Sequence, residues 1–182
     1  MTLNETEFRR LIETHQSMVF SIALRITGER GAAEEIAQDV FLELYEAMEK
    51  VKSEEHVRFW LRRVTVFRAT DCLRRRARRP EFQAEEWMEE GASRRNGRKD
   101  GQEGEFGSEQ VGVRLERLLL SMPEALRGVI VLRYQEEMAP EEIAALLQQP
   151  VATVKSNLQR GLGLLRRKAK VMLKEFRRER VG

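Results

Sequence analysis

The sequence predicts an all-α protein with two small helical domains joined by a flexible linker. Through most of the 182 residues, apolar side chains recur three and four positions apart, which is the spacing of an amphipathic helix. Aromatic residues, which strands favour, make up only 7% of the chain. Residues 80–112 interrupt the periodicity and are rich in Gly, Glu, Arg and Gln. We therefore expect a first domain at 1–79, a linker at 80–112 and a second domain at 113–182.

Three helices are expected in the first domain. The first helix begins near Glu5, with Asn4 and Glu7 placed as a start cap, and Gly28 and Gly31 end it. Its apolar face consists of Phe8, Leu11, Ile12, His15, Val19, Phe20 and Ala23.

The second helix runs from Ala32 to about Val51, and the third follows a turn at 52–55. Six side chains of the second helix are expected to point inward: Ile36, Val40, Phe41, Leu44, Tyr45 and Met48. The third helix carries Phe59, Trp60, Val64, Phe67, Ala69, Cys72 and Leu73. Pro80 ends the domain, because proline cannot continue a helix.

The linker has few apolar anchors, and we expect one short helix within it, around Ala84 to Glu90. At about thirty flexible residues, its root-mean-square span is roughly 30 Å. That length lets the two domains lie on separate targets.

The second domain begins with two more helices. The first contains Leu115, Leu118 and Leu119 and ends before Pro123, and the next contains Leu126, Val129, Ile130 and Leu132. The segment from Met138 to Lys168 then predicts two helices joined by a tight turn. Pro140 suits the first helical position, where its missing N–H is not needed, and Gln149 and Pro150 mark the turn.

The last helix has two distinct faces. The apolar face consists of Val151, Val154, Leu158, Leu162 and Leu165, and the opposite face carries Thr153, Lys155, Ser156, Asn157, Gln159 and Arg160. Such short or forked polar groups reach base edges and phosphates when the start of a helix enters a major groove. The pattern therefore favours a DNA-binding helix-turn-helix, although an antiparallel helix pair with a solvated face has the same spacing.

Charge is unevenly distributed along the chain, although the net charge is only +3. Arginines dominate residues 58–79, and lysines and arginines dominate residues 155–180. Acids dominate residues 29–55. Two basic blocks suggest two contacts with a polyanion, and the acidic block suggests a different partner.

Several classes of function are not favoured. The single Cys72 cannot form an internal disulfide, and His15 and His56 are too isolated to form a metal site. We find no glycine-rich phosphate loop and no credible Ser/His/Asp arrangement, and we expect no catalytic residue, small-molecule substrate, cofactor or metal. The N-terminus lacks the apolar core of a signal peptide, and no run is long enough for membrane insertion, so a cytoplasmic protein is expected.

Three segments in order resemble one family. They are AEEIAQDVFLELYEAM at 33–48, FWLRRV with ATDCLRRRARR across 59–79, and LLLSMPEALRGVIVLRYQEEMAPEEIAALLQQPVATVKSNLQRGLGLLRRK at 118–168. Together they resemble a sigma-70 family RNA polymerase sigma factor of the small extracytoplasmic-function (ECF) type, which keeps only sigma region 2 and sigma region 4. The resemblance covers nearly everything outside the linker.

The resemblance implies roles for the first domain. Its second helix would dock on the clamp helices of the largest subunit of core RNA polymerase, through Glu35, Gln38, Asp39 and Glu43. The third helix would hold the minus-ten element of the promoter. An exposed aromatic ring suits an unpaired base and cations suit phosphates. The residues expected there are Trp60, Arg62, Arg63, Arg68, Arg74, Arg75 and Arg76, with Trp60 equally suited to the core.

The resemblance also implies roles for the second domain. Leu115, Leu118, Leu119, Leu126 and Ile130 would shape an apolar groove for the polymerase flap, or form core. Thr153, Lys155, Ser156, Asn157 and Arg160 would contact the minus-thirty-five element. Members of the family are commonly held inactive by an anti-sigma factor, which is therefore a further expected partner.

Four positions depart from the family pattern. Phe67 replaces a usual asparagine, Gln148 replaces the usual glycine before the turn, Ala152 is the next small residue, and Asn157 replaces a common arginine. These departures predict a slightly altered turn and an unusual base preference. A stand-alone helix-turn-helix regulator remains the alternative function, but such a regulator does not explain the first domain.

Overall fold

Helices joined by short turns make up the part described by the computed structural model, which covers residues 5–47, 53–78 and 106–179. The helices are α1 (Glu5–Thr27), α2 (Arg30–Ala47), α3 (Glu54–Ala77), α5 (Phe106–Leu120), α6 (Glu124–Tyr134), α7 (Pro140–Leu147) and α8 (Val151–Glu179). These residues include no strand, which confirms the all-α prediction. The cap at Asn4, the end of the second helix beyond Ala47 and the short helix expected at 84–90 lie outside the described residues.

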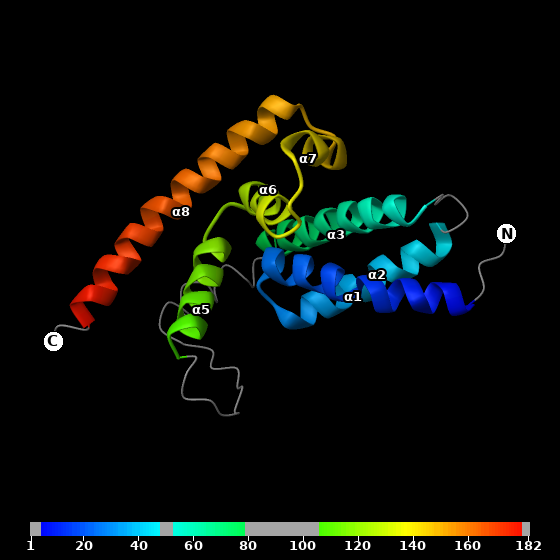
Figure 1. Cartoon of the computed structure of the whole chain (residues 1–182), viewed down its shortest axis with the longest axis horizontal. Helices are drawn as coiled ribbons and strands as arrows, with labels where there is room; N and C mark the ends of the chain where they lie inside the picture. Colours follow the sequence, from blue (N-terminus) through cyan, green and yellow to red (C-terminus); the bar gives the residue numbers. More distant parts are fainter. Residues whose placement is uncertain (1–4, 48–52, 79–105, 180–182) are drawn as a thin grey trace.

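Helices α1, α2 and α3 pack into the bundle that forms the first domain (Figure 1). Fully buried side chains such as Ile22, Val40 and Leu61 fill its centre. Ser53 caps α3 by accepting a hydrogen bond from the His56 N–H at 3.2 Å. This cap satisfies a backbone donor that the first turn of a helix leaves free.

The break after α1 depends on Gly28 alone. Gly28 has φ 77°, and Leu120 of α5 lies so close that a Cβ there would meet its side chain at 2.8 Å. Glycine is therefore required both by the left-handed backbone and by the close packing. The expectation that Gly31 also ends the first helix is wrong, because Gly31 lies in the first turn of α2.

Two aromatic residues described in the first domain are exposed, and one of them, Tyr45, is expected from the sequence to point inward. Tyr45 is 63% exposed and Phe67 is 45% exposed. The buried stripes pass through Val40 and Leu44 in α2 and through Val66 and Ala69 in α3, so both rings lie on the flank of their helix. Tyr45 packs edge-on against Phe8, at 5.0 Å between ring centroids, outside the core.

The second domain, made of α5, α6, α7 and α8, is arranged around α6. Every residue from Leu126 to Leu132 is buried, because α6 packs against α7 and α8 on one side and against α1 and α3 on the other (Figure 1). A helix that is buried all round is expected at the centre of a packed body. Helix α8 is the longest and carries the C-terminus away from the first domain (Figure 1).

The two domains contact each other directly. Helices α5 and α6 lie against α1, and α6 and α7 lie against α3. Helix α5 already begins at Phe106, before residue 113, where we expected the second domain to start. Most of the expected linker lies outside the described residues.

Candidate nucleic-acid interface

Helices α7 and α8 form the two-helix unit expected at Met138 to Lys168. Pro140 is the first residue of α7, and the Glu142 carboxylate accepts a hydrogen bond from the Ala139 N–H at 2.6 Å. Gln148 ends α7 in the left-handed conformation, with φ 54° and ψ 46°. The position where the family pattern has glycine therefore keeps the glycine-type backbone without a glycine.

The beginning of α8 presents its polar residues to solvent. Val154 and Leu158 are buried and fix the helix against the domain. Thr153, Lys155 and Arg160 are exposed, and Ser156 and Asn157 are half-buried. The five side chains expected to contact the minus-thirty-five element thus come from one stretch of α8 that a DNA groove can approach.

Lys155 has one carboxylate neighbour. Its Nζ lies 3.0 Å from Oε1 of Glu141 in α7, and both side chains are exposed. The hydrogen bond from Lys155 lowers the pKa of the Glu141 carboxyl below its usual range. An exposed pair of this kind contributes little to stability, so Lys155 can exchange this carboxylate for a phosphate or a base.

The arginines of α3 are mostly engaged with carboxylates. The pairs are Arg62 with Glu136 at 2.8 Å, Arg68 with Asp39 at 2.7 Å, Arg74 with Glu124 at 2.7 Å, Arg75 with Asp71 at 2.9 Å and Arg76 with Glu29 at 2.8 Å. Arg68 also contacts Glu43. Two of these carboxylates, Glu124 and Glu136, come from the second domain. Five of the six arginines expected to bind phosphates are therefore paired with carboxylates.

Arg63 differs from the other arginines of this set, because its guanidinium lies over the exposed ring of Phe67, 5.8 Å from the centroid. Trp60, by contrast, is half-buried and packs against the core. Phe67 and Arg63 line a groove of about 660 Å³ between α3 and the second domain. Leu147 and Gln149 form part of its opposite wall. The sequence did not predict this wall, because we expected two separate domains joined by a flexible linker.

The acidic face of α2 is only partly free. Glu35, Gln38 and Asp39 are exposed, whereas Glu43 is half-buried and held by Arg68. Leu42 continues this face and is 64% exposed. Leu42 was not predicted to belong to this surface, although its spacing of four from Gln38 places it on the same side of the helix.

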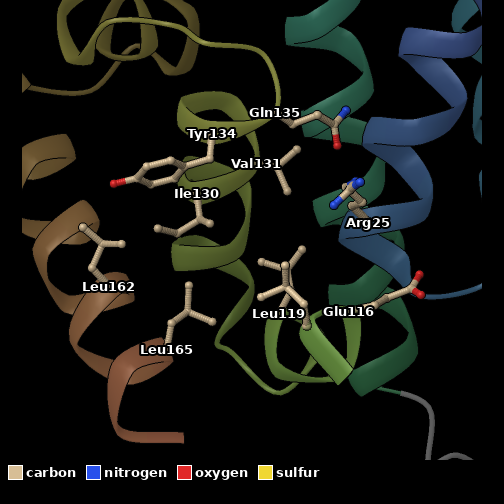
Figure 2. A pocket seen from close by; sticks show the side chains of 10 residues that line it. Arg25, Glu116, Leu119, Ile130, Val131, Tyr134, Gln135, Leu162 and Leu165 are labelled. Atoms are coloured by element: carbon tan, nitrogen blue, oxygen red, sulfur yellow. The ribbon is translucent and has the colours of Figure 1, made fainter. Parts of the chain in front are cut away.

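An apolar groove of about 400 Å³ is lined mainly by α5, α6 and α8 of the second domain, with Arg25 of α1 from the first domain. Figure 2 shows Leu162 and Leu165 of α8 facing Ile130 and Tyr134 of α6, with Arg25 of α1 on the far side. Of the five leucine and isoleucine residues expected in such a groove, Leu115, Leu119 and Ile130 line it. Leu126 is buried in the core, and Leu118 is half-buried outside the groove lining.

Within the ranges that the structure describes, no cluster of His, Cys, Asp or Glu is arranged to hold a metal ion. The same residues include no helix that is long and apolar enough to cross a membrane.

Comparisons with known proteins match both domains. The family model described as sigma-70 region 2 matches residues 11–79, and the model described as sigma-70, region 4 matches residues 112–165. The chain is 29% identical to the ECF RNA polymerase sigma-E factor of Escherichia coli K12, over 87% of this chain and 84% of that protein. It is 26% identical to the ECF sigma factor SigW of Bacillus subtilis, over 90% of this chain and 89% of that protein.

The fold is also similar to that of a solved sigma factor. The RpoE structure from Bartonella quintana, determined in complex with the anti-sigma factor NepR, has a TM-score of 0.66 and 17% identity. The match covers 91% of this chain and 98% of that chain. At this identity the likeness concerns the fold.

Proposed function

Because the chain belongs to the ECF group of the sigma-70 family, we propose that it binds core RNA polymerase, recognises a bipartite promoter and promotes transcription initiation. One observation carries this proposal: an exposed helix-turn-helix face lies in the same chain as a domain matched by the region 2 model. The role is that of a non-enzymatic subunit. No observation favours a stand-alone regulator.

We assign the minus-thirty-five element to α8. Lys155 and Arg160 are long, exposed and cationic, so they reach guanine edges or phosphates. Thr153, Ser156 and Asn157 lie beside them and add hydrogen-bonding groups. Asn157 offers the amide that pairs with adenine, which supports a base preference different from the one implied by the arginine of the family pattern.

We assign the minus-ten element to the α3 side of the groove. The exposed Phe67 ring, with Arg63 beside it, is suited to stack an unpaired base of the opened strand. Arg62, Arg68, Arg74, Arg75 and Arg76 supply the cations for its phosphates, and Trp60 supports the helix from the core side. Stacking on Phe67 thus takes the place of the polar contact that the family pattern implies for an asparagine at this position.

We assign polymerase docking to two surfaces. Glu35, Gln38, Asp39 and Glu43, with Leu42 among them, form the surface of α2 for the clamp helices. The apolar groove at Leu119, Ile130 and Leu162 suits the flap, because an exposed apolar hollow favours a partner helix. An anti-sigma factor is a further partner, supported by the fold shared with a protein solved in such a complex.

Transcription with purified components tests the function. The chain is added to bacterial core polymerase on genomic DNA, and transcript starts are mapped. We expect new starts that share two upstream elements separated by a constant spacer. Tight promoter binding by the chain alone, with no added starts, would instead identify a regulator. A chain carrying both Lys155→Ala and Arg160→Ala is the matched negative control.

A further inference from the structure

An ion pair joins the two helices of the helix-turn-helix. Oε1 of Glu141, the second residue of α7, lies 3.0 Å from Nζ of Lys155 in α8. Ile143 and Val154 are fully buried close to these positions in the chain, so packing fixes the backbone from which each charged side chain extends. The side chains of Glu141 and Lys155 themselves are 61% and 57% exposed. The pair is therefore held between two fixed points and is accessible to DNA.

Stability does not explain the carboxylate of Glu141. An ion pair between exposed side chains adds little to the free energy of folding. The start of α7 also has another carboxylate, because Glu142 accepts the hydrogen bond of the Ala139 N–H at 2.6 Å. For binding to DNA, a negative charge beside the recognition residues is unfavourable, since it repels the phosphates of every sequence. A contribution of Glu141 to DNA binding must therefore concern the choice of sequence.

The donors of Lys155 can serve Glu141 and a base at the same time. A lysine ammonium has three N–H donors on a long, flexible stem. Glu141 takes one donor and thereby limits the directions in which the other two point. Those two match the N7 and O6 acceptors that guanine presents in the major groove. Contact with guanine thus keeps the ion pair, whereas exchange of Glu141 for a phosphate leaves an unpaired carboxylate next to the DNA backbone.

We propose that Glu141 is a positioning residue for base recognition, which directs Lys155 to one guanine of the upstream promoter element and opposes its contact with phosphates. The proposal rests on the proposed function and deepens it, because it names the base that Lys155 contacts. Removal of the carboxylate releases Lys155 to phosphates, which strengthens binding to mismatched sites and lowers discrimination. Arg160, which forms no ion pair with Glu141, contacts DNA independently.

Transcription from a set of altered promoters tests the positioning. Each base pair of the upstream element of a mapped promoter is replaced in turn by the others, and initiation by core polymerase with the chain is measured. Lys155→Ala identifies the guanine that Lys155 contacts, as the position where the base preference disappears. We expect Glu141→Gln to reduce the preference for that same guanine at least about fivefold and to raise initiation from the mismatched templates. Preferences at the other positions should remain.

Glu142→Gln is the matched control. It removes the same charge from the neighbouring position, and the amide oxygen of glutamine still accepts the hydrogen bond of the Ala139 N–H. This variant should keep the full base preference. A substitution that only weakens folding would lower initiation from all templates alike and leave the preferences intact.

Combined variants separate positioning of Lys155 from a general effect of charge. In a chain that carries Lys155→Ala, Glu141→Gln should cause no further loss of base preference, because the side chain that it positions is absent. In a chain that carries Arg160→Ala, Glu141→Gln should have its full effect, because residues without a shared contact act additively.

An unchanged preference in Glu141→Gln, an equal loss in Glu142→Gln, or a base other than guanine at the Lys155 position would overturn the proposal. If the unmodified chain directs no initiation with core polymerase, the proposed function fails instead. Selection of randomised DNA duplexes on the immobilised chain then decides the role of Glu141. The unmodified chain should enrich guanine at one position and Glu141→Gln should not, whereas equal enrichment by both would refute the positioning.

Discussion

At the residue scale, Gln148 adopts a backbone that suits glycine better. A non-glycine residue in the left-handed region costs about 1–2 kcal/mol, while glycine loses about 0.5–1 kcal/mol through the entropy of the unfolded chain. We expect Gln148→Gly to raise the free energy of unfolding by up to about 1 kcal/mol, measured by urea denaturation. Gln149→Gly is the control, because its φ is not positive, and it should lower stability. Equal losses in both variants would show that Gln148 is unstrained.

The buried His15 makes stability depend on pH. Desolvation by burial lowers the pKa of its imidazole below the ordinary 6.5, and the attraction of Glu54 only partly opposes this. Between the two pKa values the unfolded chain binds more protons, so stability is full above about pH 6.5 and decreases as the pH falls below it. We expect the urea concentration at the unfolding midpoint to decrease as the pH is lowered from about 7.5 to about 5.5. His15→Leu should flatten this dependence, whereas Gln16→Leu, at the exposed neighbouring position, should not. An unchanged slope in His15→Leu would assign the effect to other groups.

At the scale of elements, α8 separates base contacts from phosphate contacts. On promoters with the preferred upstream element, Lys155→Ala or Arg160→Ala should weaken the free energy of DNA binding by about 1–3 kcal/mol and lower initiation accordingly. Initiation from other promoters should not change. Arg166→Ala, farther along the helix, should weaken all promoters alike and reduce the salt dependence. Transcription from matched templates with altered upstream elements checks both results. A uniform loss for Lys155 and Arg160 would mean that they contact only phosphates.

Substitutions on the exposed surface of α2 should weaken binding to core polymerase and leave promoter choice unchanged. Asp39→Asn removes one exposed charge, and Arg68 keeps its contact with Glu43, so the helix should remain in place. We expect weaker binding to core polymerase, measured by competition with a labelled copy of the chain, and unchanged transcript starts. Glu13→Gln, which removes one exposed charge from α1 and not from α2, serves as the control. Unchanged affinity in Asp39→Asn would remove Asp39 from the docking surface.

At the scale of the whole molecule, local sequence patterns predicted the helices but not the contacts between residues that are distant in the sequence. Helical spacing located the helices and the exposed start of α8, because an amphipathic stripe is a local property. The contact of Arg62 with Glu136 joins residues 74 positions apart, and no periodicity marks it. For the same reason, the arginines of α3 were expected to be available to phosphates, and their carboxylate partners were not foreseen. The prediction that Tyr45 points inward was wrong, because hydrophobicity does not distinguish the flank of a helix from its buried stripe.

The shared packing of the domains also predicts how the chain unfolds. Arg127 holds the end of α1 to the turn between α5 and α6, and Gly28 packs against Leu120 at the same place. We therefore expect a single cooperative unfolding transition, both in guanidinium chloride, monitored by circular dichroism, and on heating, monitored by calorimetry. Arg127→Met keeps the length of the side chain but leaves carbonyls without their donor, which costs about 1–3 kcal/mol for each buried group.

One of the three carbonyls, that of Ile26, belongs to the first domain, so Arg127→Met also weakens the contact between the domains and should separate the transition into two. Arg133→Met is the matched control, because Arg133 donates to the Met138 carbonyl at 2.9 Å within the second domain. It should lower the midpoint and keep one transition. Two transitions in the unmodified chain would mean that the domains are stable independently and that the interface adds little to either.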